Sequence, residues 1–564
     1  MKEQPGGRTR RLPLRGVFRL GRFGDIWHKH ALSAVIALAI PDLILLAMGR
    51  LDLAVYTSAG AMCALYAHGL PYAARARSLI WVALGMIGGV GVALVTSGLT
   101  RSTAILIIVS AVLAALHKVV CDATRIGPPG NLIFTFMAAT CAFIPQRLSE
   151  VPFHLALAAL GALLAWLVCM APALVRPEGP QRIAVARALE AVARLPRAAP
   201  SRRDPQDDTP ARITPVPRVR HDAAAAVNAA WRTLLPVPAS PNRGALERLL
   251  VHAEETLATG FSTEAARLTG WATDLRRNRP LPRTSLTGNE AAELTGIAME
   301  RAVRSREPSV LRAFHPASAL FPIGIRVAVG SALAGLTSMA LGVGHPYWAV
   351  VMAASVFQAN AVLSWQRALQ RALGSVFGLL AFTLLLPISR AGQLALVLLV
   401  LLLQFCTEAL ITRNYWLGTV CVTPMALLLT EFSGYQPAGQ LIADRWLDTC
   451  VGVAAGLLGC LLVTNRRTAG RIDAALHRVA VTQAAAGHLL ESGSAGPGDI
   501  SRARGLLVAA LVELREAAEV AAGEWWQRVL PAEQIAQAEQ EGHRTLARLR
   551  GPARDRVASK SISG

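Results

Sequence analysis

Residues 77–97, RSLIWVALGMIGGVGVALVTS, form an apolar run with no charged side chain after Arg77. A transmembrane α-helix needs about 20 predominantly apolar residues, so this run is long enough to cross a bilayer. Similar runs flank it, and together they form two sets of six along the chain. Hydrophobic residues make up 53% of the sequence and its mean hydropathy is +0.41, more than a soluble core of this size can bury. The sequence therefore predicts a membrane protein.

Each set of six apolar runs is followed by a long polar stretch with helical periodicity. We expect an all-α polytopic membrane protein with about 12 transmembrane helices in two six-helix repeats. An even number of spans in each half gives both halves the same orientation, so the repeats are parallel. The spans at 51–70 and 130–146 are short or contain polar residues, and either could be re-entrant instead. The predicted spans lie near 30–48, 51–70, 77–97, 102–119, 130–146, 152–174, 318–342, 346–363, 368–387, 391–409, 415–430 and 446–463.

The runs and the polar stretches between them predict five parts. Residues 199–220 are rich in Pro, Asp and Arg and have almost no apolar periodicity, which is typical of a flexible linker. The parts are a basic N-terminal segment (1–29), a first six-helix membrane half (30–175), a linker with a helical domain (176–317), a second six-helix membrane half (318–465) and a helical tail (466–564).

Basic residues concentrate in the three segments outside the apolar runs. Residues 1–29 carry 8 Lys and Arg, 176–317 carry 22 and 464–564 carry 14, out of 57 in the chain. The positive-inside rule then predicts a cytoplasmic N-terminus, central region and C-terminus on a multi-pass protein of the inner (plasma) membrane. Anionic membrane lipid is the partner that this charge favours. Nucleic acid is not expected, since the central segment also holds 15 acidic residues and no aromatic-interleaved basic stripe.

No sequence motif indicates an enzyme. The chain lacks a GxxxxGK[ST] phosphate loop, an HExxH zinc motif and a GxSxG nucleophile motif with suitable partners. Its eight cysteines lie in or beside apolar runs without CxxC or metal-ligand spacing, so they are interpreted as packing residues. We expect no cofactor and no metal, and transport driven by an ion gradient or by a separate subunit.

The two halves resemble each other locally. The glycine pair Gly85 and Gly89 in the third run corresponds to Gly374 and Gly378 in the ninth, and GxxxG pairs favour close helix packing. His30 begins the first run where Arg326 begins the seventh, although the surrounding residues differ. A substrate pathway is therefore expected between the two halves.

Three sequence elements of the second half resemble one known family. They are His345-Pro-Tyr347-Trp348-Ala leading through Gln358, then Arg367-Ala-Leu-Gln-Arg371-Ala-Leu-Gly374, and Arg445-Trp-Leu-Asp448-Thr449-Cys-Val-Gly452. Together they are similar to the FUSC family, named for fusaric acid resistance and including aromatic acid exporters. The motifs lie within residues 320–465, and the resemblance extends to the layout of the whole chain.

The resemblance implies export of aromatic or other hydrophobic carboxylic acids, with a more distant likeness to plant malate-type anion channels. It also brings Tyr347 and Trp348 into the candidate substrate-binding set. The first half departs from the pattern, because it lacks the tyrosine-tryptophan start and the RxxDT element and has Pro41-Asp42 within its first run.

Arginines within or beside the apolar runs are the candidate anion-binding residues. A charge in hydrocarbon costs about 2.5 kcal/mol or more, so such groups usually face a cavity or a partner. A guanidinium offers a paired fork of donors that suits a carboxylate. Arg326, with Arg367 and Arg371 at the cytoplasmic mouth, is expected to bind the anion. The alternatives are snorkelling of Arg326 and simple interfacial anchoring of Arg367 and Arg371.

Two carboxyl groups are candidates for proton coupling. Burial favours the protonated form of a carboxyl group, which would allow Asp448 or Asp42 to carry a proton in exchange for the acid. For Asp448 the alternative is an i to i+3 ion pair with Arg445, and for Asp42 it is a capping or loop role beside Pro41. We expect an exporter of small organic anions. A passive anion channel, a non-transporting scaffold acting through its cytoplasmic helices, and association of two copies all stay open.

Overall fold

The computed structural model describes most of the chain. Described are residues 27–195, 240–282, 310–357, 361–434, 437–462, 471–492, 497–521 and 532–549, apart from 125, 128, 260–263, 317 and 319. Residues 17, 18 and 20 and single residues between 219 and 238 are also described. All regular elements in these ranges are helices, as the sequence predicts. The predicted linker 199–220 falls almost entirely outside the described residues.

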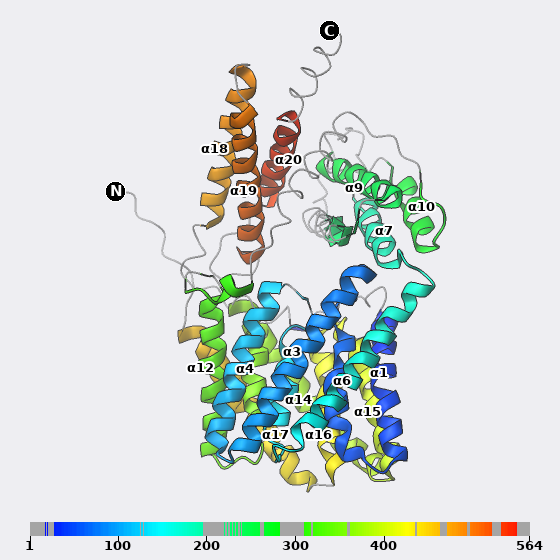
Figure 1. The fold of residues 1–564 in the computed structure, drawn as a ribbon, viewed down its shortest axis with the longest axis vertical. Helices are drawn as coiled ribbons and strands as arrows, with labels where there is room; N and C mark the ends of the chain where they lie inside the picture. The colour runs from blue at the N-terminus through cyan, green and yellow to red at the C-terminus, as the bar shows by residue number, and fades with distance from the viewer. Residues whose placement is uncertain are drawn as a thin grey trace, which may run out of the picture.

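A bundle of helices forms one end of the molecule, and the remaining helices lie beyond the other end of this bundle (Figure 1). We call the bundle end next to these remaining helices the domain end, and the opposite one the far end. The bundle consists of α1 (Trp27–Ala47), η1 (Leu51–Leu53), α2 (Ala54–Ala61), η2 (Met62–Leu65), α3 (Tyr72–Leu99), α4 (Thr103–Thr124), α5 (Leu132–Ala142), α6 (Val151–Met170), α12 (Phe321–Ala340), α13 (Tyr347–Val356), α14 (Ala361–Ser389), α15 (Gln393–Ile411), α16 (Tyr415–Thr430), η5 (Glu431–Ser433) and α17 (Ala438–Leu462).

Seven of these helices are long and apolar enough to cross a membrane within the part of the chain that is described: α1, α3, α4, α6, α12, α14 and α15. Four apolar segments are shorter: Leu51–Leu65, Leu132–Ala142, Tyr347–Val356 and Tyr415–Thr430. The two spans predicted as short or re-entrant are among them. The predicted span 346–363 does not hold as one helix, because α13 ends at Val356 and α14 already begins at Ala361.

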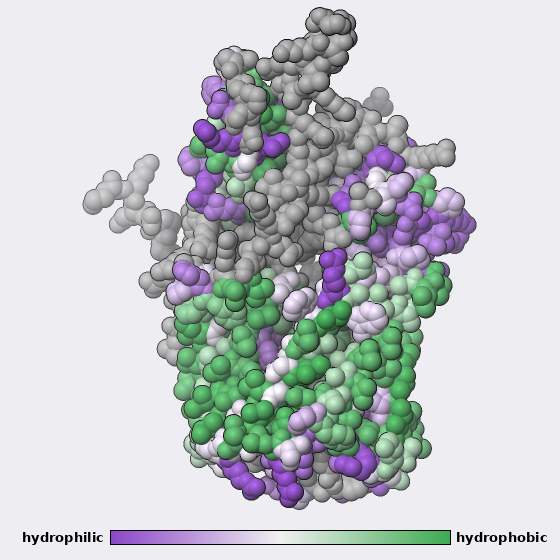
Figure 2. Space-filling model, viewed as in Figure 1, coloured by the Kyte–Doolittle hydropathy of each residue, from purple (hydrophilic) through white to green (hydrophobic). Residues whose placement is uncertain are grey.

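The outer surface of the bundle is apolar. Large hydrophobic side chains such as Ile44, Trp81, Leu160 and Leu384 are 54–78% exposed. Figure 2 shows hydrophobic residues covering the visible face of the bundle, while hydrophilic residues gather on the helices beyond the domain end and along the far end. This surface suits hydrocarbon on its sides and water at both ends, as expected of a membrane-spanning bundle.

Helices of the two halves pack against each other in a reciprocal way. The first helix of each half, α1 or α12, lies against the fourth helix of the other half, α15 or α4 respectively. Within each half, the short second helix packs against the sixth, as α2 does on α6 and α13 on α17. These four contacts occur at corresponding positions of the two sets of helices.

Glycine allows several of these close contacts. A Cβ atom at Gly374 or Gly378 would lie 2.5–2.6 Å from Cβ atoms of α16, those of Thr419 and Thr423. A Cβ at Gly89 would lie 2.7 Å from Nε2 of His117. Such distances exclude a side chain without movement, so these glycines of the two GxxxG pairs lie at helix contacts, as predicted.

The helices outside the bundle form two further cores. In one, α7 (Gly179–Ala193), α9 (Pro241–Thr259) and α10 (Ala265–Arg276) bury leucines that include Leu189, Leu249 and Leu268. In the other, α18 (Arg471–Ser492), α19 (Pro497–Ala521) and α20 (Ala532–Arg548) bury Leu507 and Leu546 among others.

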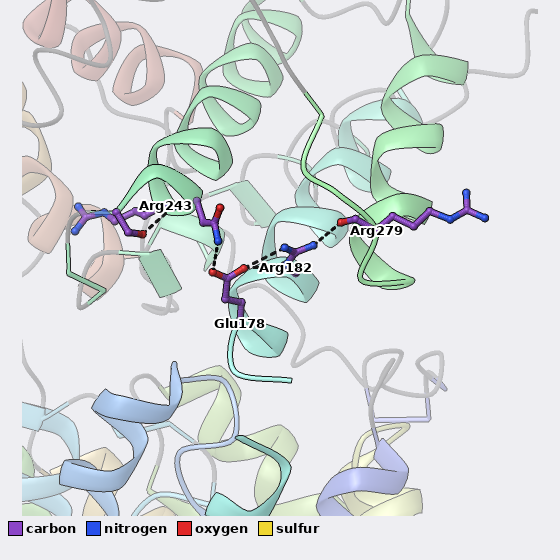
Figure 3. Close-up of polar contacts among 6 residues, drawn as sticks. Glu178, Arg182, Arg243 and Arg279 are labelled. Carbon is purple, nitrogen blue, oxygen red and sulfur yellow. Dashed lines mark hydrogen bonds and ion pairs between the residues drawn. The ribbon is translucent and has the colours of Figure 1, made fainter. Parts of the chain in front are cut away.

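Glu178 connects three parts of the first of these cores (Figure 3). Its Oε2 accepts hydrogen bonds from Nε and Nη2 of Arg182, both at 3.1 Å, and its Oε1 accepts one from Nδ2 of Asn242 at 2.7 Å. Arg182 also donates from Nη1 to the carbonyl oxygen of Arg279 at 2.7 Å. The network joins the starts of α7 and α9 to the chain that follows α10, close to where the chain leaves the bundle.

Candidate functional site

The short helix α13 lies at the centre of the second half. All ten of its residues are buried, and it packs against α4, α5, α12, α14 and α17. Pro346 occupies its N-cap position, where the absence of an N–H group carries no penalty. A helix of this length spans only about 15 Å, so it does not cross the bundle from end to end.

Arg445 of α17 stacks on Trp348 of α13. The guanidinium carbon Cζ lies 4.9 Å from the centroid of the Trp348 ring, a cation–π geometry. The opposite neighbour of this ring is His345, stacked at 4.5 Å with 16° between the planes. Arg445 is 1% exposed, and its Nε has no hydrogen-bond partner in the described part of the protein. Arg445 is thus a buried cation in cation–π contact with an aromatic ring.

Asp448 follows one turn later on α17 and is fully buried. Its Oδ1 accepts a hydrogen bond from Oγ of Ser338, on α12, at 2.5 Å. Its Oδ2 has no partner among the described residues. The ion pair with Arg445 considered from the sequence is not found in these residues, because the guanidinium is directed to Trp348 instead.

His345 and Asp444 form a second polar pair nearer the far end. Nδ1 of His345 lies 3.1 Å from Oδ2 of Asp444. Both groups are largely buried, and the pair holds the His345 ring flat against Trp348. Asp444 therefore contacts His345, while Arg445, the next residue on α17, contacts Trp348 of α13.

Arg371 of α14 approaches α13 from the domain end. Its Nε donates to Sδ of Met352 at 3.1 Å, and its Nη1 donates to the hydroxyl of Tyr415, on α16, at 3.2 Å. A thioether sulfur is a weak acceptor, so this guanidinium is only partly satisfied. One turn earlier, the Cζ of Arg367 lies 3.7 Å from the centroid of the Tyr415 ring.

These side chains form one site along a single face of α13. Trp348 and Met352 are four residues apart, so Arg445 and Arg371 meet α13 about 6 Å apart along its axis. Their charges are near enough to act on each other. We call this group the α13 arginine site, and it consists of Ser338, Trp348, Met352, Arg371, Tyr415, Arg445 and Asp448.

Four predicted residues lie outside this site, and one of them, Arg367, borders it through the Tyr415 ring. Tyr347 is buried and packs on Phe143 of the first half, with ring centroids 5.3 Å apart. Arg326 is buried on α12 and its Nε has no partner in the described residues, so it does not snorkel to a surface. Asp42 is buried on α1 with Oδ1 unpartnered in the described residues, and Pro41 lies within the helix. No hydrogen bond or ion pair between described residues joins Arg326 or Asp42 to the α13 arginine site.

The sequence interpretation missed Arg445, Met352, Tyr415 and Ser338 as members of the site. Arg445 was considered only as a partner of Asp448, although its place in an apolar run is itself a signal. The other three are common residues of buried helices and have no distinguishing spacing. In the described part of the chain, no three His, Cys, Asp or Glu residues gather closely enough to hold a metal ion.

Comparison with known proteins agrees with the resemblance found in the motifs. Residues 333–459, which include α13 and most of α17, match the family described as fusaric acid resistance protein-like. An uncharacterised membrane protein of Bacillus subtilis (strain 168), YvaC, is 25% identical over 93% of this chain and 86% of its own length. An uncharacterised protein of Synechocystis sp. (strain ATCC 27184 / PCC 6803 / Kazusa), slr1298, is 26% identical over 144 residues, which are 26% of this chain and 19% of its own. No solved structure matches the chain.

Proposed function

We propose that this membrane protein, whose second half matches the fusaric acid resistance protein-like family, exports organic acids as anions through the α13 arginine site. The observation that carries the proposal is the proximity of two buried guanidinium groups, those of Arg371 and Arg445, neither of which forms an ion pair with a carboxylate among the described residues.

An uncompensated charge inside a membrane protein is costly, and such groups mark ion or substrate pathways. A bound carboxylate would supply the missing acceptors, since a guanidinium can donate two parallel hydrogen bonds to it. The Trp348 ring beside Arg445 makes the surroundings of the guanidinium apolar, which suits an acid with a hydrophobic or aromatic part. The site therefore suits a small acid with one apolar part and one charged part.

The arrangement of the pathway is part of the proposal. We take the bundle as two parallel six-helix repeats, and the reciprocal packing of α1 on α15 and of α12 on α4 supports this. The basic segments favour a cytoplasmic domain end in the inner (plasma) membrane. Arg367 then lies nearer the cytoplasm than Arg371, and Arg445 lies farther, so the three form a path outward.

An energy source follows from the charge of the cargo. An anion that leaves the cell moves towards the positive side of the membrane, which is worth about 2.3 kcal/mol per 100 mV. A passive channel could use this alone. An exporter would in addition exchange protons, and Asp448 and Asp42 are the buried carboxyl groups proposed for that step.

The test is benzoate flux in proteoliposomes that contain the full chain. Protein-free liposomes give the baseline, because neutral benzoic acid crosses lipid unaided. We expect flux above the baseline, and Arg371→Gln should lower it at least tenfold while Arg77→Gln, on the exposed face of α3, leaves it unchanged. Flux equal to the baseline in the unaltered protein would reject the proposal.

A second arm separates the exporter from the channel. At zero membrane potential, an imposed pH gradient should drive benzoate uphill towards the acidic side in the exporter and not in the channel, whereas the leak of neutral benzoic acid accumulates benzoate on the alkaline side. Replacement of both Asp448 and Asp42 by Asn should abolish this uphill movement. If the double variant keeps it, the coupling group lies elsewhere, and if neither protein shows it, the channel is the better description.

A further inference from the structure

We infer that Asp448 sets the charge of the anion that the α13 arginine site accepts, restricting it to singly charged acids. The inference rests on the proposed function and names the substrate class of the same site. It starts from three ionisable side chains: Arg371 and Arg445, which contact α13, and Asp448, which lies one turn after Arg445 on α17.

The positions of these groups follow from helix packing. A Cβ at Gly452 would lie 2.4 Å from Cβ of Met352 and 2.8 Å from the carbonyl oxygen of Ala349, so α17 touches α13 there without a side chain between them. Arg445 and Asp448 precede Gly452 by seven and four residues, which places all three on one stripe of α17. Along the axis of α17, Asp448 therefore lies between Arg445 and the position that faces Met352, the residue that Arg371 contacts.

Oγ of Ser338 donates a hydrogen bond to Oδ1 of Asp448. A hydroxyl that donates to a carboxylate favours its ionised form, which is the form we assign to Asp448. The carboxylate stays separate from the guanidinium groups, because Arg445 lies on Trp348 and Arg371 on Met352 and Tyr415. It therefore lowers the charge of the site without occupying the donors that an anion needs.

The charges then determine the cargo. Two guanidinium groups and one ionised carboxylate leave a single positive charge, which one carboxylate neutralises. A dicarboxylate would leave an excess negative charge in a medium of low dielectric, where such a charge is strongly unfavourable. Two further ionisable groups lie nearby: Asp444 is hydrogen-bonded to His345, and Arg367 lies one turn from Arg371 over the Tyr415 ring. The variants compared below leave both unchanged, so a shift between them reports on Asp448.

This role also limits what proton exchange can do. Asp448 remains ionised while the anion is bound, so protonation belongs to the return of the empty site. A proton on Asp448 would raise the local charge to two and favour a doubly charged anion instead.

The experiment compares benzoate with isophthalate, which adds a second carboxylate to the same ring. Binding of each is measured to the full chain in lipid nanodiscs, so that the result does not depend on transport. The unaltered protein should bind benzoate at least tenfold more tightly than isophthalate. Asp448→Asn should shift the ratio of the two affinities at least tenfold towards isophthalate, and Asp448→Glu, which keeps the charge, should preserve the benzoate preference.

Glu431→Gln is the matched control, because it removes a buried carboxyl group of η5 that lies outside the α13 arginine site. It should leave the affinity ratio as in the unaltered protein. An unchanged ratio in Asp448→Asn, or a loss of both acids from a protein that still elutes as one monodisperse species, would overturn the inference. If the unaltered protein binds neither acid, the proposed function fails with it. Benzoate binding with an unshifted ratio rejects the charge selection alone.

Discussion

The two membrane halves share one helix contact and differ in the chemistry beside it. A Cβ at Gly161 of α6 would lie 2.1 Å from the carbonyl oxygen of Thr57 and 3.1 Å from the backbone nitrogen of Ala61. At Gly452 of α17 the corresponding atoms belong to Ala349 and Ala353, at 2.8 and 3.2 Å. In both halves, the short second helix and the sixth helix thus touch backbone to backbone.

Equivalent positions next to this contact carry different side chains. Counting back seven residues from each glycine gives His154 and Arg445, and counting back one from the first contacted residue gives Tyr56 and Trp348. His154 stacks on Tyr56, with centroids 3.9 Å apart and 7° between the planes, as Arg445 lies over Trp348. A basic group on an aromatic ring is therefore present in both halves.

The first half satisfies its pair and the second half does not. Nδ1 of His154 lies 2.8 Å from Oε1 of Gln146, and Nε2 of Gln146 donates to the hydroxyl of Tyr56. Gln146, His154 and Tyr56 thus form a triangle of mutual contacts in which Gln146 hydrogen-bonds to both other side chains. Arg445 has no such partner at Nε in the described residues, and it lies within the range that matches the family, residues 333–459. We call the backbone contact at Gly161 and at Gly452, which both halves share, the frame. The charged site is a feature of the second half.

The largest effect is expected from breaking the shared frame. Gly452→Val and Gly161→Val each place a branched side chain against a backbone atom of the facing helix. The two helices can then no longer pack at this distance. We expect little or no monodisperse protein from either variant, and the loss of yield should be equal for the two. Yield after size-exclusion chromatography measures this.

Gly88→Val is the control, since a Cβ at this exposed position of α3 would meet no atom within 4 Å. It should give the yield of the unaltered protein. A normal yield for Gly161→Val together with a loss for Gly452→Val would show that the two contacts are not equivalent, and the comparison would lose its frame.

The sequence predicts the frame better than the site. Apolar runs and glycine spacing report on local composition, so the membrane class, the helical fold and the glycine contacts of α3 and α14 follow from them. Arg445 and Trp348 are 97 residues apart, and their stacking depends on how α17 docks on α13. The spacing of Arg445 and Asp448 favoured an ion pair, which holds in an isolated helix but loses here to Trp348 and Ser338 from other helices. A single sequence does not report which helix faces which.

A smaller effect is expected from exchanging the two basic groups for leucine. Arg445→Leu should reduce benzoate flux between about tenfold and a hundredfold, the range for hydrogen bonds to a charged group. Its thermal stability should stay equal or rise, because an unpaired buried charge is removed. His154→Leu should show the reverse, with flux within twofold and a stability loss of about 1 kcal/mol from the opened triangle.

Flux in proteoliposomes and a thermal melt on the same preparations measure both quantities. The paired design guards against misfolding, since a variant that gains stability and loses flux is folded. A loss of stability in Arg445→Leu would make Arg445 a structural residue, like its counterpart His154.

The smallest effect concerns Ser338 and Asp42. Each lies twelve residues after Arg326 or His30, the two residues that the sequence comparison of the halves aligns. Ser338→Ala removes the donor that holds Asp448 away from Arg445. Asp448 can then turn towards the guanidinium and compete with the anion, so benzoate affinity should fall about two- to fivefold, or ~0.5–1 kcal/mol. Asp42→Ser gives the first half the serine that the second half has at this position. Benzoate affinity should not change, because the α13 arginine site lies in the second half. Equal losses in the two variants would mean that both halves contribute to binding, and the assignment of the site to the second half would be wrong.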